Sequence, residues 1–317
     1  MLVLHADPLF EEHITPGHHP ERPERSRKVA EALGALEGVR RAEVDAAPGG
    51  ALEDVARVHD PGYARAVAAL AARGGGALDA DTFVSPRSYE VALAAVGAVS
   101  SAVDTACQAA PGAVEARAFA VVRPPGHHAR PATGMGFCLF NNVAVAAARA
   151  RAVHGLSRVA IVDFDVHHGN GTQEIFWEEP QVFFVSTHGA GFYPGSGSAD
   201  EAGAGAARGT KLNLPLPPSV GSAGYRAAFR RGVDAVRAFR PELVLVSAGF
   251  DAWKRDPLGD LGLDAGDYRW IGEELGAIAR EHAQGRVVAA LEGGYDLGAV
   301  GRLAAAFAQG LCAGAEG

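Results

Sequence analysis

The sequence predicts an α/β protein with one mostly parallel β-sheet that helices cover on both faces. Five apolar runs have the length and composition of buried strands, at residues 118–122, 158–164, 181–187, 242–249 and 286–294. Segments of helical period lie between them at about 139–153, 224–239 and 266–283, and a further helix is expected after Asp296. Fully apolar strands indicate a sheet buried on both faces. Repeated strand–loop–helix units indicate parallel strands joined by right-handed crossovers.

Length and charge favour one large domain that does not bind nucleic acid. The 317 residues are 48% hydrophobic, which is enough for a sizeable core, and no linker divides them. We therefore expect a single domain over residues 1–317. The 29 Lys and Arg against 37 Asp and Glu give a formal charge of −8, so a phosphate backbone would meet net repulsion.

Cysteine usage and the first residues favour a cytoplasmic protein. Cys107, Cys138 and Cys312 are widely spaced and form no C-x-x-C, which argues against a disulfide framework and a thiolate zinc site. The N-terminus lacks a basic start followed by an apolar stretch, and no run of 18 apolar residues occurs. We expect a soluble protein of the reducing cytoplasm, without a membrane segment.

Reactive side chains gather directly after four of the predicted strands. RPPGHHA follows the first, DFDVHHGNGT the second, AGFDAWKRDPLG the fourth and EGGYD the fifth. In open α/β sheets, ligands bind outside the carboxyl ends of the strands. We therefore expect these four segments to assemble a single site.

Three of these side chains could bind a metal ion. Asp165 and His167 are two residues apart, so their side chains would point to the same side if the strand persists. Asp251, after its own strand, is the best third ligand. Such a set leaves a coordination position open, as catalytic zinc requires, and would also accept Fe(II). The alternative for a D-x-H alone is a pair of ordinary loop residues that cap the next helix.

Further polar residues fit acid–base chemistry near such a metal. His127 and His128 follow a rigid Pro-Pro-Gly turn and could exchange protons with a nearby water and a leaving group. Asp163 could orient one imidazole and Asn170 the other. The hydroxyl of Tyr295 is an O–H donor suited to an oxyanion. Taken singly, a histidine pair is more often an incidental surface feature, and such a tyrosine is more often a half-buried core residue.

Large aromatic side chains on loops indicate the walls of a narrow apolar channel. We expect six residues on four loop segments to contact the substrate. They are Gly136 and Phe137 in GMGFC, Phe192 and Tyr193 in GFYPGSG, Gly293 in EGGYD, and Leu258 in DPLG at the mouth of the channel. Packing beneath a loop would explain any one of the aromatic residues equally well.

Taken together, the motifs resemble those of the metal-dependent histone deacetylases and their bacterial relatives, the deacetylase-like amidohydrolases and acetoin-utilisation proteins. RPPGHHA, GFCLFNNVAVAA, DFDVHHGNGTQ, VSAGFDAWKRDPLG and LEGGYDL occur in the order and spacing of that family. HHPERPER resembles its first loop. The resemblance extends from about residue 5 to residue 310.

The resemblance implies the arginase/deacetylase fold and hydrolysis of an N-acetyl amide on an extended alkyl chain. It implies a zinc ion held by Asp165, His167 and Asp251, with Fe(II) as an alternative. By motif position, His128 would be the general base and then acid, His127 its electrostatic partner paired with Asp163, and Tyr295 the donor to the carbonyl oxygen. Phe137 and Tyr193 would line an acyl-lysine tunnel. A K⁺ or Na⁺ ion would involve Asp163, Asp165, His167 and Ser186.

Three positions sharpen what the resemblance implies. Asn170 stands where class I members have Asp, and the motifs around it are class II-like. Tyr295, where some class II members carry His, supports true deacetylase activity. Leu258 occupies the position of the glutamate in the polyamine-selective branch, so the expected substrate is an acetyl-lysine protein, peptide or similar amine.

Other functions and assemblies stay open at this point. Acetylpolyamine or other small-molecule amide hydrolysis is the main alternative to acetyl-lysine hydrolysis. An arginase-like enzyme with two Mn ions would need a second aspartate beside Asp251, and the neighbours Gly249, Phe250 and Ala252 offer none. A catalytically silent ligand-binding homologue is disfavoured by the intact His127, His128 and Tyr295. A homo-oligomer is compatible with the sequence, which does not determine the oligomeric state.

Overall fold

The computed structural model describes residues 1–45 and 50–316, and within them eight parallel strands form one continuous sheet. Their order across the sheet is β2-β1-β5-β10-β9-β6-β7-β8, and every neighbouring pair is parallel. The strands are β1 Leu2–His5, β2 Val39–Ala42, β5 Arg117–Ala120, β6 Val159–Asp163, β7 Val182–Gly189, β8 Lys211–Leu216, β9 Leu243–Ala248 and β10 Val287–Leu291. A separate antiparallel pair joins β3 Gly76–Ala77 to β4 Phe83–Val84.

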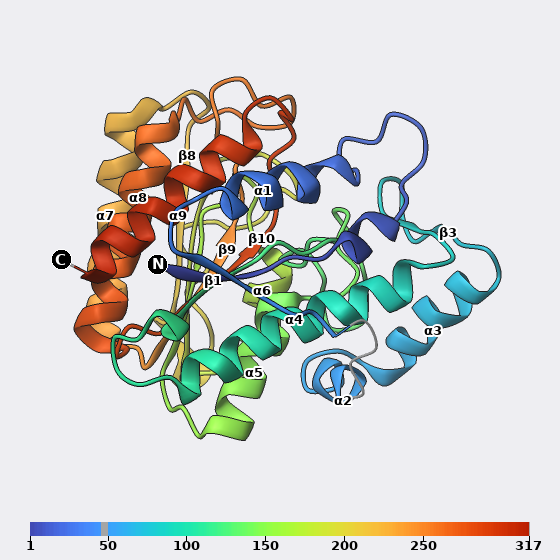
Figure 1. Ribbon diagram of the computed structural model, residues 1–317, viewed down its shortest axis with the longest axis horizontal. Coiled ribbons are helices and arrows are strands. Elements are labelled where there is room, and N and C mark those ends of the chain that lie inside the picture. Colours follow the sequence, from blue (N-terminus) through green and yellow to red (C-terminus); the bar gives the residue numbers. More distant parts are fainter. Residues whose placement is uncertain (46–49, 317) are drawn as a thin grey trace.

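Helices cover both faces of this sheet, as predicted. The described helices are α1 Glu24–Gly34, α2 Ala51–Val55, α3 Pro61–Ala72, α4 Ser88–Gln108, α5 Asn142–His154, α6 Asn170–Ile175, α7 Gly221–Phe239, α8 Ala265–His282 and α9 Val300–Glu316. Figure 1 shows α1, α7, α8 and α9 gathered on one side of the sheet and α4 and α5 on the other. The smaller α2 and α3 lie beyond α4 and form a third cluster with it.

The alternating direction of the side chains along each strand explains why two hydrophobic layers form. In β5 and β9, Phe119, Val244 and Val246 pack in the layer that contains α7, α8 and α9. The intervening residues, such as Ala118 and Leu245, pack in the layer that contains α4 and α5. Successive strand side chains point to opposite faces, so an apolar residue at every position is needed to bury both.

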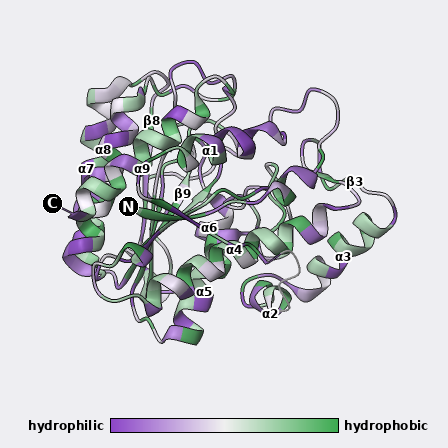
Figure 2. Cartoon of the chain, in the orientation of Figure 1, coloured by the Kyte–Doolittle hydropathy of each residue, from purple (hydrophilic) through white to green (hydrophobic). Residues whose placement is uncertain are grey.

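Helix α4 is long and mostly apolar. By length and composition it could cross a membrane, but 61% of its most apolar window is buried inside this fold. It packs against α5, β5 and β10, and Figure 2 colours most of it as hydrophobic, whereas α7 and α8 carry hydrophilic stretches. Because neighbours cover it on several sides, α4 has the character of a core helix.

The five predicted strands and four predicted helices are all present, with ends that shift by a few residues. The sequence analysis missed several elements, chiefly β1, β2, β8 and α4. β2 has the polar sequence VRRA at a sheet edge and β8 contains Pro215, so neither resembles an apolar strand. α4 has an Ala- and Val-rich sequence with few charged residues, and the sequence analysis did not assign it.

Candidate active site

Four neighbouring strands at the centre of the sheet supply the reactive residues. β5, β10, β9 and β6 are adjacent in the sheet order, and all run in the same direction. The four motif segments therefore leave the sheet at the same edge. The sequence predicted these strand ends as one site, and the strand order is the reason that they meet.

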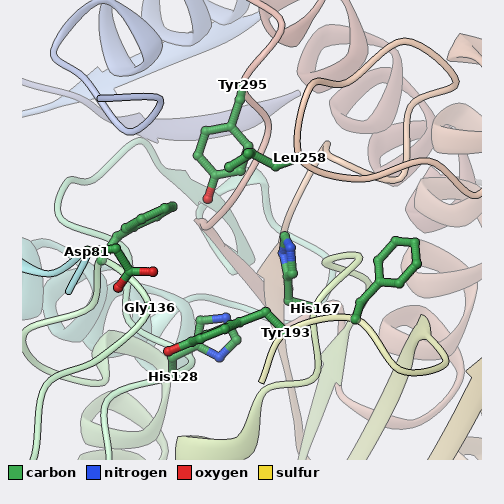
Figure 3. Close-up of a pocket in the computed structure, with 9 residues that line it drawn as sticks. Asp81, His128, Gly136, His167, Tyr193, Leu258 and Tyr295 are labelled. Atoms are coloured by element: carbon green, nitrogen blue, oxygen red, sulfur yellow. The ribbon is translucent and has the colours of Figure 1, made fainter. Parts of the chain in front are cut away.

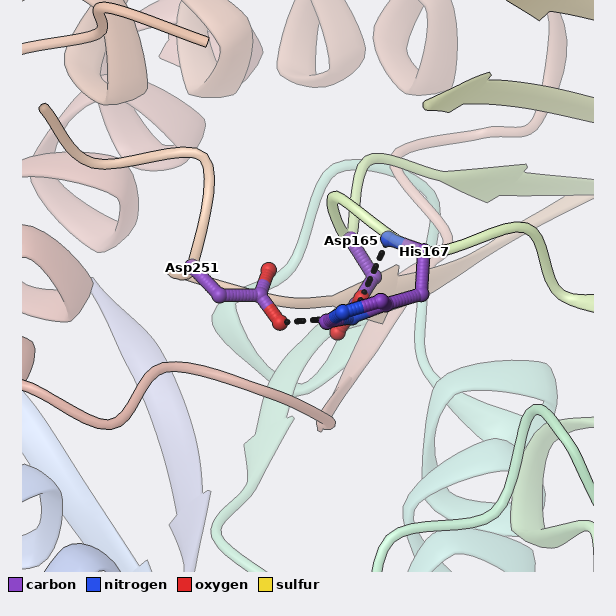
Figure 4. A group of neighbouring side chains, drawn as sticks. All are labelled: Asp165, His167 and Asp251. Carbon is purple, nitrogen blue, oxygen red and sulfur yellow. Dashed lines mark hydrogen bonds and ion pairs between the residues drawn. The ribbon is translucent and has the colours of Figure 1, made fainter. Parts of the chain in front are cut away.

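Asp165, His167 and Asp251 lie together at this edge, each offering one ligand atom, and these atoms all lie within 4.8 Å of one another. The Nδ1 atom of His167 is 3.0 Å from Asp165 Oδ1 and 3.2 Å from Asp251 Oδ2. Figure 4 shows the three side chains turned towards one another. β6 ends at Asp163, so the premise that the strand persists is wrong. The two side chains converge within a bend after the strand instead.

We call Asp165, His167 and Asp251 the metal triad, because they could hold a metal ion. Backbone N–H groups hold its two carboxylates in place. Asp165 accepts hydrogen bonds from His167 N–H at 2.9 Å and from Gly293 N–H at 2.8 Å. Asp251 Oδ1 accepts from Val166 N–H at 2.9 Å. Asp251 Oδ2 is buried and has no hydrogen-bond partner. A buried oxygen without a donor, beside an imidazole nitrogen and a second carboxylate, fits a bound cation.

The electrostatics of the triad also fit a cation. Burial and the neighbouring Asp165 raise the pKa of Asp251 above its ordinary value. Burial acts in the same direction on Asp165, but His127 and His167 outweigh it and hold the pKa of Asp165 below its ordinary value. A divalent ion would offset the repulsion between the two carboxylates and favour their ionised forms.

His127 is paired with a carboxylate. Its Nδ1 donates to Asp163 Oδ2 at 3.0 Å, and both side chains are buried. Burial alone would lower the pKa of His127, but Asp163 and Asp165 raise it to about 10. The pair therefore favours the charged imidazolium.

His128 is paired with a neutral amide instead. Its Nδ1 lies 2.8 Å from Asn170 Oδ1, and since an amide oxygen only accepts, Nδ1 carries the proton. Burial, His127 and His167 hold the pKa of His128 well below its ordinary value. The ring is therefore neutral near pH 7 with a free lone pair on Nε2, which is the form that a general base requires.

A cavity of about 340 Å³ opens above these residues. It is lined by Asp81, His128, Gly136, Phe137, His167, Phe192, Tyr193, Leu258 and Tyr295. Figure 3 shows the Tyr295 hydroxyl pointing into the cavity, across from His128 and His167. Burial raises the pKa of Tyr295 well above its ordinary value, so the hydroxyl keeps its proton as a donor.

The close packing of the cavity wall explains Gly136. A Cβ atom there would lie 2.4 Å from the His128 ring and 2.8 Å from the Tyr193 ring. Its backbone also has a φ of +54°. Only glycine fits between the two rings, so this position shapes the wall without contributing a side chain.

Comparisons with known proteins show the family of the chain. A family model described as the histone deacetylase domain matches residues 19–311. The chain belongs to the histone deacetylase family. Because its relatives include deacetylases and amidohydrolases, it is a hydrolase that acts on amides.

Two relatives show the range of the histone deacetylase family. The chain is 41% identical over 280 residues to a histone deacetylase-like amidohydrolase of Pseudomonas aeruginosa, which covers 87% of this chain and 72% of that protein. It is 40% identical over 299 residues to the chloroplastic histone deacetylase 14 of Arabidopsis thaliana, which covers 89% of this chain and 71% of that protein.

Solved structures agree over almost the whole chain. The HDA15 HD domain matches with a TM-score of 0.89 at 34% identity, covering 99% of this chain and 90% of that one. The acetylpolyamine aminohydrolase of Burkholderia pseudomallei matches with a TM-score of 0.84 at 28% identity, covering 98% of both chains. The predicted arginase/deacetylase fold is confirmed.

Most predicted site residues of this deacetylase-family chain lie at the cavity or directly beneath it, but Gly293 does not line it. A Cβ atom at Gly293 would lie 2.1 Å from Asp251 Oδ2 and 2.5 Å from Asp165 Oδ2. Gly293 allows the backbone to approach the candidate metal ligands, and its N–H donates to Asp165; its contact with substrate stays a prediction. Ser186 is paired in register with Asp163 on the neighbouring strand, and the monovalent cation stays a prediction.

Sequence reasoning missed two acidic residues of the site. Asp81 lines the cavity. Glu292 is fully buried beneath the turn that carries His127. Its Oε2 accepts hydrogen bonds from Gly126 N–H at 2.7 Å and from His127 N–H at 3.2 Å. The signal for Glu292 was a charged residue directly after the apolar run VVAAL. Asp81 lies in the loop before β4, and no local pattern connects it to the cavity.

Proposed function

We propose that the protein is a zinc-dependent deacetylase that hydrolyses the N-acetyl or longer acyl amide of acetyl-lysine or a similar alkyl amine. The observation that carries this proposal is the combination at the end of one cavity: His128 paired with Asn170, the Tyr295 hydroxyl, and the candidate metal ligands Asp165, His167 and Asp251. The cavity has aromatic walls, as a narrow site for an alkyl chain requires.

Asp165, His167 and Asp251 would hold the metal ion, with Fe(II) as an alternative to zinc. When bound, the ion would supply a Lewis acid for the amide carbonyl and the attacking water. Asp163 and Ser186, on neighbouring strands, belong to the proposed K⁺ or Na⁺ site. The free cysteines Cys107, Cys138 and Cys312 support the proposed cytoplasmic location.

The residues of the chain divide the proton chemistry. His128 would take a proton from the attacking water on Nε2 and later deliver it to the departing amine. His127, held charged by Asp163, would favour the neutral form of His128 before attack. Tyr295 would donate its hydroxyl hydrogen to the developing oxyanion, and one such donor is typically worth roughly 2.7–4 kcal/mol.

Acetylpolyamine hydrolysis is the second candidate, and two observations favour it. One of the matched structures is an acetylpolyamine aminohydrolase, and the Asp81 carboxylate lies on the cavity wall, where it could pair with a second ammonium group. Leu258 argues against acetylpolyamine hydrolysis. This apolar side chain lines the cavity at the position expected to carry a glutamate in polyamine-selective enzymes.

A substrate panel with metal control tests both candidates. Anaerobically purified protein, assayed for metal content, is given acetyl-lysine peptides, longer acyl-lysine peptides and N-acetylspermidine. We expect the highest kcat/KM for acetyl-lysine peptides, loss of activity after chelation, and recovery with Zn²⁺ or Fe²⁺. A preference for N-acetylspermidine would replace the first candidate by the second. No turnover of any acetylated substrate by the metallated protein would contradict the proposed function.

A further inference from the structure

The backbone that carries Tyr295 has few restraints of its own. Two glycines precede it, and Gly294 has a φ of +112°, a conformation that other residues rarely adopt. A glycine pair gives the chain wide conformational freedom, so contacts from elsewhere must hold the tyrosine in place. Arg25 supplies one, because its guanidinium lies 4.7 Å from the centre of the Tyr295 ring and its Nε donates to the Gly294 carbonyl at 2.7 Å.

The carboxylate of Asp256 holds the backbone at Tyr295 and at the residue that follows it. Asp256 is 9% exposed, and its Oδ2 accepts from Tyr295 N–H at 2.7 Å and from Asp296 N–H at 3.2 Å. Its Oδ1 accepts from Leu258 N–H at 3.0 Å. Asp256 therefore links the loop that carries Tyr295 to the loop that carries Leu258, and both of these residues line the cavity.

Asp256 has no cationic partner that would explain its burial otherwise. Within residues 1–45 and 50–316, no Lys, Arg or His forms an ion pair with it. The three hydrogen bonds of its carboxylate all come from backbone N–H groups of the two loops. Burying a carboxylate costs free energy unless it is well hydrogen-bonded, so these loops and Asp256 stabilise one another.

We propose that Asp256 is a positioning residue that sets the place of the Tyr295 hydroxyl by fixing the backbone on either side of the cavity. This role requires a carboxylate at position 256. Three N–H donors approach two oxygens, whereas asparagine has only one acceptor oxygen. In either orientation, an asparagine amide would turn its own N–H₂ towards the N–H groups of one loop.

This inference rests on the proposed function, because it assigns Asp256 a role through the hydroxyl of Tyr295. The effect should therefore depend on that hydroxyl. A displacement of about 1 Å in a reacting group can cost on the order of 10²-fold in rate. We expect Asp256→Asn to lower kcat by about 10- to 100-fold at unchanged metal content.

A double-mutant cycle separates positioning from general stability. The metallated full chain is compared as wild type, Asp256→Asn, Tyr295→Phe and the double variant, with a fluorogenic acetyl-lysine peptide. Tyr295→Phe alone should lower kcat by about 10²–10³-fold. In the Tyr295→Phe background, Asp256→Asn should change kcat by less than about threefold, since the hydroxyl it positions is absent.

Asp260→Asn is the matched control. Asp260 lies on the same loop, but its carboxylate accepts from Gly262 N–H and the Ser219 hydroxyl and does not line the cavity. This variant should leave kcat within about threefold of wild type. If Asp256→Asn does not fold, Asp256→Ser in both backgrounds makes the same comparison, because serine removes the carboxylate without placing an amide against the loops.

Two results would overturn the inference while leaving the proposed function intact. One is a folded Asp256→Asn enzyme with wild-type kcat. The other is an equal fold-loss from Asp256→Asn in the presence and absence of the tyrosine hydroxyl. A wild type without turnover would instead contradict the proposed function, and an unimpaired Tyr295→Phe enzyme would contradict the role of the hydroxyl.

Discussion

The floor and the rim of the cavity are built differently. The pocket floor, meaning Asp165, His167, Asp251, His127 and His128, is almost entirely buried, and its polar side chains make specific hydrogen bonds or ion pairs. The pocket rim, meaning Asp81, Tyr193 and Leu258, lies on loops, and the last two side chains are each 39% exposed. Buried polar networks tolerate little change, whereas exposed loop residues tolerate much.

This difference indicates that the floor determines the catalytic chemistry and the rim determines the substrate specificity. Replacing a floor residue leaves a buried group unpaired, so it should change metal binding, rate or protonation. Replacing a rim residue should change only the choice of substrate. Asp256 bonds to the backbone of Leu258 at the rim and of Tyr295, whose hydroxyl points into the cavity across from His128 and His167.

The largest effect is expected from the metal triad. Asp251→Ala removes a buried proposed metal ligand and leaves the Val166 N–H without its acceptor. We expect much less than one equivalent of tightly bound metal and no measurable turnover. Elemental analysis and the acetyl-lysine assay on one anaerobic preparation measure both. A fully metallated, active Asp251→Ala protein would disprove the ligand assignment.

His128→Gln should have the next largest effect. A positioned general acid–base typically contributes 10²–10⁴-fold, so we expect a loss of about that size in kcat, with metal content unchanged. His128 lines the cavity and His127 does not, so His127→Gln should cost less. Steady-state kinetics of the two variants test this order, and a larger loss for His127→Gln would reverse their proposed roles.

Asn170→Asp should change the pH dependence more than the maximal rate. A carboxylate in place of the amide favours the protonated imidazole, and an opposite charge at this range typically raises a pKa by about 1–3 units. A base must be unprotonated to act, so the acidic limb of kcat/KM should move to higher pH by about that amount.

A pH–rate profile from the acidic limb to pH 9 measures this shift. Neutral Asn170→Ser controls for loss of the amide and should keep the acidic limb of the wild type. If Asn170→Asp left the limb in place, the acidic limb would not report the protonation of His128, and its role as the general base would be contradicted.

The smallest effect is expected at the rim. Leu258→Glu adds an exposed carboxylate beside the cavity, and an exposed ion pair is typically worth about 0.2–1 kcal/mol. The kcat/KM ratio of N-acetylspermidine to acetyl-lysine peptide should therefore rise by up to about fivefold. Metal content and melting temperature should match those of the neutral Leu258→Gln variant. A large loss of metal in Leu258→Glu would show that rim and floor are not independent.

Several features of the protein could be read from its sequence alone. The five apolar runs identified the inner strands, because burial on both faces demands an apolar residue at every position. The unusual polar residues after four of those runs identified the floor, including His127, His128 and the metal triad. These signals are local, since each lies within a few residues of a strand end.

Only the tertiary structure decided how distant segments meet. The adjacency of β5, β10, β9 and β6 follows from long-range strand pairing, and no local pattern encodes it. The placement of Asp81 on the cavity wall and the bond between Asp256 and Tyr295, 39 residues apart in the chain, also depend on contacts between distant segments. Sequence periodicity reports which face of an element is buried, but the partner across that face is chosen by the packing of the whole domain.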